Sequence, residues 1–317
     1  MLLLGFVLFS VFFYLFSIVF ASHRIFIKTL SRQSKDQWAR GAPSSQNPSH
    51  LQMDREGLAW QEKFNSCKKD VHIINDGLNL YGEYYDLGYD KGVMILSGRT
   101  ESLRYGYYFA KPYTDSGFNV LVVDPRAHGY SDGTYNTLGF EESKDAIAWA
   151  NYLSKEFGIK TLVFHGICIG AAGGILAITS PQCPQCVKGL VTEGMFPNFA
   201  ESMKNHLIER KKLLFPIEQC IDFWMKRYTG HSMKNGPIDV ISGMNKPLLM
   251  IQSKMDKYST AENAKKMFVL CPSKEKKLVL YEKGDHSMLR ITDTETYDSE
   301  IAMFLQRLMT ACERQTV

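Results

Sequence analysis

Short apolar runs alternate with amphipathic stretches over most of the 317-residue chain from residue 71 onward. The apolar runs predict buried strands at residues 92–96, 119–124, 161–165, 187–192, 246–253 and 277–281. Helical spacing of apolar residues predicts helices at residues 103–116, 141–157, 168–179 and about 299–309. Strands that alternate with helices indicate an α/β fold, in which a mainly parallel sheet carries helices on both faces.

Two further strands precede this alternation. Residues 71–74 and 78–85 flank the turn Asn75-Asp76-Gly77 and predict a hairpin. An antiparallel hairpin at the start makes the sheet mixed at one edge.

The alternation is interrupted at residues 196–241, where two helical patterns, 198–214 and 217–228, have no buried strand between them. An insertion at this place lies over the carboxyl ends of the strands, where such sheets bind ligands. We therefore expect a lid. The alternative is a pair of ordinary packing helices.

The N-terminal stretch is apolar and uncharged from residue 2 to residue 21. Twenty helical residues span about 30 Å, the thickness of a bilayer core. No Lys or Arg precedes the run, and Arg24, Lys28 and Arg32 follow it. The positive-inside rule then predicts a single-pass anchor at residues 1–22 with the following domain in the cytoplasm. The alternative is a signal peptide cleaved after Val19-Phe20-Ala21 and a secreted product, although the run is long for a signal and lacks a basic start.

Residues 23–65 are expected to connect the anchor to a globular domain at residues 66–317. The polar stretch at residues 31–50 predicts a tether. Residues 53–64 predict a short amphipathic helix that lies either on the domain or on the membrane surface.

Composition narrows the function classes. The net charge is +4, and no long basic stripe runs through the body of the chain, so no nucleic-acid partner is expected. Seven cysteines, an odd number in a long chain, favour free thiols in a reducing compartment over a disulfide framework. One close pair, Cys183-Pro-Gln-Cys186, lacks a second pair at metal-ligand spacing and is interpreted as a turn rather than half a zinc site or a redox pair.

The candidate nucleophile is Cys168, in the run Gly166-Ile167-Cys168-Ile169-Gly170 between a predicted strand and a predicted helix. A sharp strand–nucleophile–helix turn needs small neighbours, which the two glycines provide. The helix N-terminus beneath the thiol favours the thiolate. The competing interpretation is a small buried thiol.

A candidate acid and a candidate base come after the nucleophile in the chain. Asp256 comes after the strand that ends at residue 253, and His286 comes after the strand that ends at residue 281. In this role the histidine takes the thiol proton and the aspartate orients the imidazole. Otherwise Asp256 caps the helix that begins near Ser259, and His286 is an ordinary loop histidine.

The pentapeptide resembles the nucleophile elbow of the α/β-hydrolase superfamily, with Cys in place of the commoner Ser, and the resemblance covers residues 71–309. Within the superfamily, residues 96–102 and 124–131 resemble the oxyanion loop and the Asp-x-Arg-x-x-Gly-x-Ser loop of the bacterial lysophospholipase and monoacylglycerol-lipase (serine aminopeptidase-type) group. The departure at Cys168 resembles dienelactone hydrolases and polyhydroxyalkanoate synthases instead. The resemblance implies oxyanion donors at the backbone N–H groups of Arg99 and Ile169.

These features predict an acyl hydrolase that cleaves a carboxylic ester or thioester through a covalent acyl-enzyme. The expected substrate is lipid-like or acylated, and no cofactor or metal is expected. Glu101, His128 and Glu193 are candidates for the substrate pocket. Two alternatives remain open: an acyltransferase that uses the same acyl-enzyme, and a catalytically inactive binding protein of the same fold.

Overall fold

A computed structural model describes residues 2–32, 47–212 and 214–314. Eight strands form one sheet in the order β1-β2-β4-β3-β5-β6-β7-β8. Their bounds are β1 (Lys68–Asn75), β2 (Leu78–Tyr85), β3 (Lys91–Leu96), β4 (Asn119–Val123), β5 (Thr161–Ile167), β6 (Val187–Glu193), β7 (Leu248–Ser253) and β8 (Lys276–Tyr281). The leading hairpin pairs antiparallel with β4, and the remaining pairs are parallel. The expected mixed α/β sheet is confirmed.

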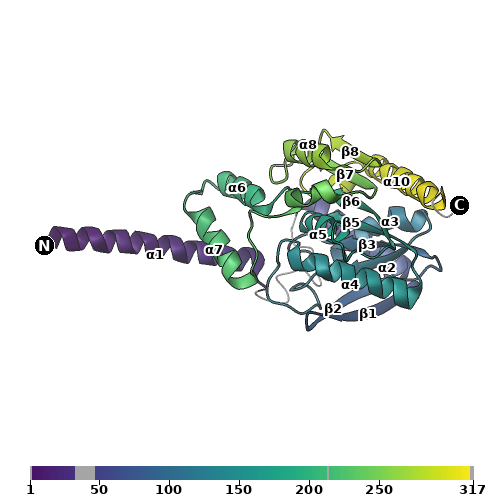
Figure 1. The fold of residues 1–317 in the computed structure, drawn as a ribbon, viewed down its shortest axis with the longest axis horizontal. Helices are drawn as coiled ribbons and strands as arrows, with labels where there is room; N and C mark the ends of the chain where they lie inside the picture. The colour runs from purple at the N-terminus through teal and green to yellow at the C-terminus, as the bar shows by residue number, and fades with distance from the viewer. Residues whose placement is uncertain (1, 33–46, 213, 315–317) are drawn as a thin grey trace.

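Helices cover both faces of the sheet (Figure 1). One face packs against α3 (Leu103–Asp115) and α10 (Thr294–Arg314), and the other against α4 (Phe140–Phe157), α5 (Ile169–Ile178) and α8 (Ala261–Leu270). Because apolar side chains line both faces of the central strands, these strands form continuous apolar runs in the sequence. The last helix is longer at both ends than the predicted 299–309.

The N-terminal helix α1 (Leu2–Leu30) continues eight residues beyond the predicted end of the anchor. Its first part is exposed and is long and apolar enough to cross a membrane. Its last turns carry Phe26 and Leu30, both fully buried, which pack against the insertion at residues 196–241. This contact keeps residues 23–30 helical, although the sequence predicted a connecting segment there. Most of the tether predicted at residues 31–50 lies outside the described residues.

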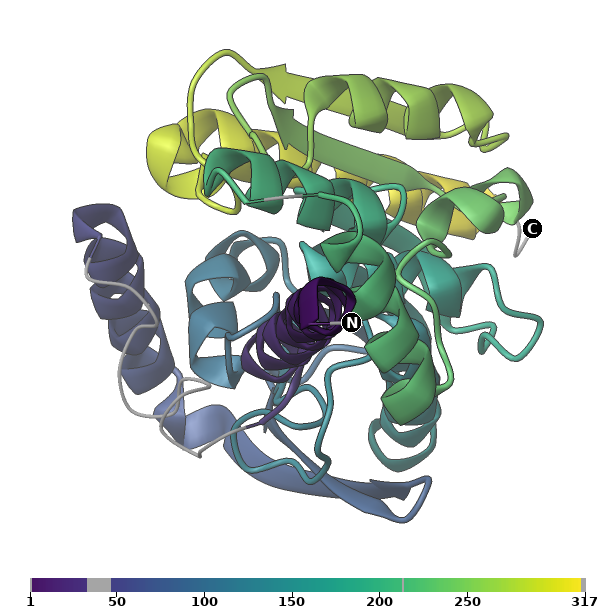
Figure 2. The same cartoon turned by 90° about the vertical axis from the view of Figure 1, so that its left-hand side faces the viewer.

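The insertion contains α6 (Phe199–Glu209) and α7 (Ile217–Thr229). Figure 1 shows α1 extending away from the sheet, with α6 and α7 beside the part of α1 nearest the domain. Figure 2 looks along α1, with the insertion helices next to it. Trp224 Nε1 donates to Ser22 Oγ at 3.2 Å. The rings of His23 and Trp224 pack edge-on, with their centroids 4.7 Å apart. The insertion and α1 therefore form one packed unit.

The short helix predicted at residues 53–64 is α2 (Pro48–Lys63), and it lies on the domain. It packs against α3, where Gly57 lets the two backbones approach and Trp60 is buried. Arg104 of α3 donates to both carboxylate oxygens of Asp54 at 2.6 Å. Of the two positions left open by the sequence, the structure has the one on the domain.

Candidate active site

Cys168 lies at the sharp turn between β5 and α5, with φ 54° and ψ −112°. A non-glycine residue rarely has a positive φ, so the surrounding turn must hold this one in place. A Cβ on Gly166 would come within 2.5 Å of the Ala171 backbone, and a Cβ on Gly170 would come within 1.9 Å of the Leu96 carbonyl oxygen. Both glycines are therefore required by close backbone approach. The Cys168 N–H donates to the Glu193 carbonyl at 2.8 Å.

The structure brings His286 and Asp256 to the same place. His286 Nδ1 lies 2.6 Å from Asp256 Oδ2, and His286 lines the same cavity as Cys168, close enough for its charge to act on the thiol. Asp256 Oδ1 accepts the backbone N–H groups of Tyr258 and Ser259 at 2.8 and 2.9 Å. Asp256 therefore holds the turn before α8, whereas the predicted capping of the helix itself was wrong, because α8 begins at Ala261 and Thr260 is its N-cap.

The electrostatics of these three groups favour an ion pair. Burial alone would raise the pKa of the Cys168 thiol, but the His286 charge and hydrogen bond and the Arg99 charge lower it below its usual range. Burial opposes the charge on His286 as well, yet Cys168 and Asp256 raise the pKa of its imidazole well above the usual range. Burial raises the pKa of Asp256, but the contact with His286 lowers it overall. A thiolate beside an imidazolium can attack a carbonyl carbon.

A glycine that the sequence did not single out makes room for the imidazole. Gly194 follows β6 with φ +64°, and a Cβ there would lie 2.9 Å from His286 Cε1. A side chain at this position would push the ring away from Cys168.

The loop after β3 lies against the nucleophile. A Cβ on Gly98 would be 3.4 Å from the Cys168 Cβ, so the residue before Arg99 lies against the nucleophile. The N–H of Ile169 is one of the first in α5, where no carbonyl of the same helix is available to accept it. The roles of the two N–H groups as oxyanion donors stay a prediction.

A cavity of about 220 Å³ opens at Cys168 and His286. The loop 98–101 forms one wall and α6 contributes Phe199, Ser202 and His206. Tyr105 lines it too, and its hydroxyl donates to the Ser287 carbonyl at 2.6 Å. Tyr258 lies between the other rings, stacked on His206 at 3.8 Å and edge-on to His286 at 5.9 Å. No sequence signal had marked Tyr105, Tyr258 or the side chains of α6 as residues of the cavity.

Of the three predicted pocket residues, Glu101 lines the cavity, whereas His128 and Glu193 do not. His128 is fully buried: Nδ1 contacts the Arg126 carbonyl at 2.8 Å and Nε2 accepts the Thr100 N–H at 3.3 Å. It therefore holds the loop after β3 from behind.

Glu193 is also fully buried, behind the nucleophile. It accepts the Leu289 N–H at 2.9 Å and the Tyr297 hydroxyl at 2.7 Å, and burial raises its pKa. It links β6 to α9 (Leu289–Thr292) and α10, and it does not line the cavity. The sequence could not show this, because the partners of Glu193 are distant in sequence.

The remaining candidate sites carry less chemistry. Cys183 and Cys186 are both free, and Cys186 is buried against the Ala150 carbonyl. Among the described residues, no group of three His, Cys, Asp or Glu side chains could hold a metal ion.

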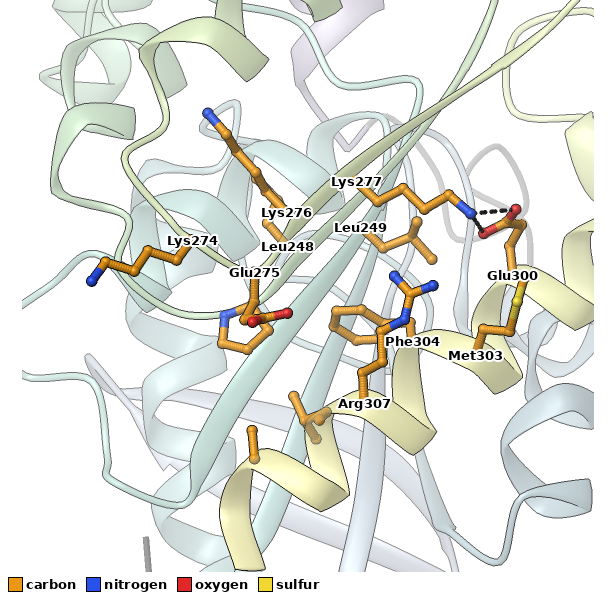
Figure 3. Close-up of a pocket in the computed structure, with 13 residues that line it drawn as sticks. Leu248, Leu249, Lys274, Glu275, Lys276, Lys277, Glu300, Met303, Phe304 and Arg307 are labelled. Atoms are coloured by element: carbon orange, nitrogen blue, oxygen red, sulfur yellow. Dashed lines mark hydrogen bonds and ion pairs between the residues drawn. The ribbon is translucent and has the colours of Figure 1, made fainter. Parts of the chain in front are cut away.

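A second cavity of about 260 Å³ lies at the amino ends of β7 and β8, beside α10, where Lys277 pairs with Glu300 (Figure 3). Cys168, Asp256 and His286 follow the carboxyl ends of their strands, so this cavity lies at the opposite ends of the strands from the nucleophile.

Comparison with known proteins defines the fold. No family model matches the chain. The uncharacterized protein YqkD of Bacillus subtilis is 26% identical over 264 residues, which are 80% of this chain and 84% of that protein. An esterase of Pyrococcus furiosus superposes with a TM-score of 0.65 at 22% identity, covering 78% of this chain and 93% of its own. An α/β hydrolase of Vibrio vulnificus superposes with a TM-score of 0.59 at 19% identity, covering 87% and 99%. The chain has the α/β-hydrolase fold.

Proposed function

We propose that this protein is an acyl hydrolase that cleaves a carboxylic ester or thioester with Cys168 as the nucleophile. The observation that carries the proposal is the contact of His286 Nδ1 with Asp256 Oδ2 at 2.6 Å, in a cavity that Cys168 also lines and where the His286 charge lowers the pKa of the thiol. The hydrolases and esterases that share the fold agree with it.

In the first step the thiolate attacks the carbonyl carbon, and the oxygen becomes an oxyanion that the N–H groups of Ile169 and Arg99 stabilise. The His286 imidazolium then donates its proton to the leaving alcohol or thiol, and a thioester to Cys168 remains. In the second step neutral His286 takes a proton from water, whose oxygen attacks the thioester. The acid leaves and the thiolate–imidazolium pair is restored. Asp256 holds the tautomer of the ring throughout.

We propose that the substrate is lipid-like and that α1 anchors the protein in a membrane. The 29 residues of α1 extend about 43 Å, and its last turns are packed on the insertion, so a bilayer core of about 30 Å places α7 at the membrane surface. The insertion exposes Phe215 and Phe223, with 76% and 57% of their surface accessible. Exposed aromatic rings suit the interface between headgroups and water. In this position the insertion acts as a lid over the cavity.

The anchor is preferred to a cleaved signal because Ile18 and Ser22, on either side of the alternative cleavage site, both face the insertion. The basic residues after the apolar run favour a cytoplasmic catalytic domain.

The test uses the full chain in detergent micelles with p-nitrophenyl esters and acyl thioesters of several chain lengths. Wild type should turn over at least one class, and Cys168→Ala should lose at least a thousandfold in kcat/KM. Cys220→Ala, which removes a half-exposed thiol on α7, is the matched control and should behave as wild type. Equal turnover by wild type and Cys168→Ala would remove the proposal.

A further inference from the structure

Arg99 lines the cavity that contains Cys168, its charge acts on the thiol, and the proposed reaction uses only the backbone of this residue. Its side chain donates from Nη1 to the Thr29 carbonyl at 3.3 Å, at the end of α1. That bond occupies one of five N–H donors. The negative end of the α1 dipole assists it but supplies only a partial charge.

Two other enclosed arginines in this chain have carboxylate partners. Arg104 forms a two-point pair with Asp54, and Arg126 forms one with Asp145. In contrast, Arg99 makes no ion pair with any carboxylate in the described part of the chain. The thiolate of Cys168 is the negative charge that Arg99 meets in the cavity, and this charge is lost when the sulfur is acylated. Because an enclosed charge without a counter-charge is costly, this arrangement indicates that the acyl substrate brings a counter-charge of its own.

The surroundings of Arg99 add positive charge. Burial lowers the pKa of Arg99, although Cys168 and Glu101 oppose this. Burial, followed by the charges of Arg99 and Arg210, lowers the pKa of His206 to about 4. The imidazolium of His286 is on the other side of the thiol. An anion that enters here meets cationic groups from two walls of the cavity.

We propose that Arg99 is a specificity-determining residue that binds an anionic group, a carboxylate or a phosphate, carried by the acyl substrate close to its scissile carbonyl. This inference rests on the proposed function. A guanidinium offers two parallel N–H donors that match the two oxygens of either anion. Since Arg99 follows Gly98, which lies against Cys168, and lines the same cavity as the nucleophile, the anion is expected only a few bonds from the cleaved bond.

Alkylation of Cys168 tests the subsite without requiring turnover. Iodoacetate and iodoacetamide have nearly the same size, and only iodoacetate is negatively charged. The measured quantity is the ratio of their rate constants for Cys168 in the full chain in neutral detergent, divided by the same ratio for free cysteine. Changes in thiolate fraction cancel in this ratio. Mass spectrometry of the Cys168 peptide separates it from the other six thiols.

We expect the normalised ratio to exceed one in wild type and to fall about tenfold in Arg99→Gln. Arg99→Lys keeps the charge but lacks the two parallel N–H donors of a guanidinium, so its normalised ratio should lie between those of wild type and Arg99→Gln. Arg227→Gln removes an exposed arginine of α7 and should leave the ratio unchanged. A ratio equal in wild type and Arg99→Gln would overturn the subsite. A wild-type ratio at or below one would do so without any variant.

Ester pairs then identify the source of the anion. On the acyl side, mono-4-nitrophenyl glutarate is compared with 4-nitrophenyl valerate; on the leaving-group side, a lysophosphatidate is compared with the matching monoacylglycerol. Preference for the anionic member of either pair, lost in Arg99→Gln, supports the subsite and names its side. Preference for the neutral member of both pairs overturns it. If the wild type cleaves none of these four or of the esters and thioesters named above, the proposed hydrolysis fails, and the alkylation ratio still decides whether Arg99 binds anions.

Discussion

Arg99 Nη1 and the Thr29 carbonyl oxygen, 3.3 Å apart, join the loop beside the nucleophile to the last turn of α1. The same turn is fixed by a hydrogen bond from the Asn136 N–H to the Leu30 carbonyl at 2.8 Å. The helix proposed to cross the membrane is therefore hydrogen-bonded to the loop that lines the reaction site. Its two halves are expected to respond differently to substitution.

Replacing Phe26 by Ala tests the inner half of α1. Phe26 is fully buried and stacks on Tyr228 with ring centroids 5.3 Å apart, so its loss should destabilise the packed unit by about 3 kcal/mol. Phe16→Ala is the matched control, because Phe16 is 56% exposed in the outer half. Thermal unfolding in one detergent measures both. Equal midpoints for the two variants would contradict the packing of α1 on the insertion.

The pH dependence comes from the thiolate–imidazolium pair. The lowered pKa of Cys168 means that thiolate forms as pH rises through a value below 9.0, and the raised pKa of His286 means that imidazolium persists until pH exceeds a value above 6.5. Alkylation by iodoacetamide should therefore begin at lower pH than for an ordinary thiol. His286→Ala removes the main stabilising partner and should shift this onset upward. Cys183, whose pKa is raised by burial, serves as the internal reference. An unshifted onset in His286→Ala would argue against the pair.

Gly194→Ala tests the position of the imidazole. The added Cβ would lie 2.9 Å from His286 Cε1, and φ is +64°, so the ring must move away from the thiol. We expect kcat to fall at least tenfold while the far-ultraviolet circular dichroism is kept. Gly243→Ala is the control, because a Cβ there meets nothing within 4 Å. Wild-type kcat in Gly194→Ala would show that the ring position does not limit catalysis.

The proposed topology is tested on sealed cells with a membrane-impermeant maleimide. If the catalytic domain is cytoplasmic, half-exposed thiols such as Cys67 and Cys220 should react only after the membrane is permeabilised. A cysteine introduced at an exposed extracytoplasmic tag provides the positive control. Labelling of Cys67 in intact cells would place the domain on the outer side.

The sheet and the succession of its strands along the chain were predictable because each buried strand leaves an apolar run in the sequence. Cys168, Asp256 and His286 could be proposed for the same reason, since each comes directly after a strand. The order of the strands within the sheet was not predicted. The roles of His128 and Glu193 could not be predicted, because burial of a polar side chain depends on partners far away in sequence, such as Tyr297.

The end of α1 shows the same limit. Phe26 and Leu30 form too short an apolar pattern to predict a helix, and only their contact with residues of the insertion explains it. That Arg99 has no carboxylate partner among the described residues was equally invisible, because the sequence shows which charges exist but not which carboxylates approach them.

The central claim is that an acyl group is carried by Cys168, and the mass of the Cys168 peptide after acid quench within the first turnovers of an acyl ester tests it most directly. The account predicts a mass increase equal to the acyl group on that peptide in wild type and none in Cys168→Ala. Hydrolysis that proceeds while the Cys168 peptide keeps its unmodified mass, or an acyl group found on another residue, would contradict it.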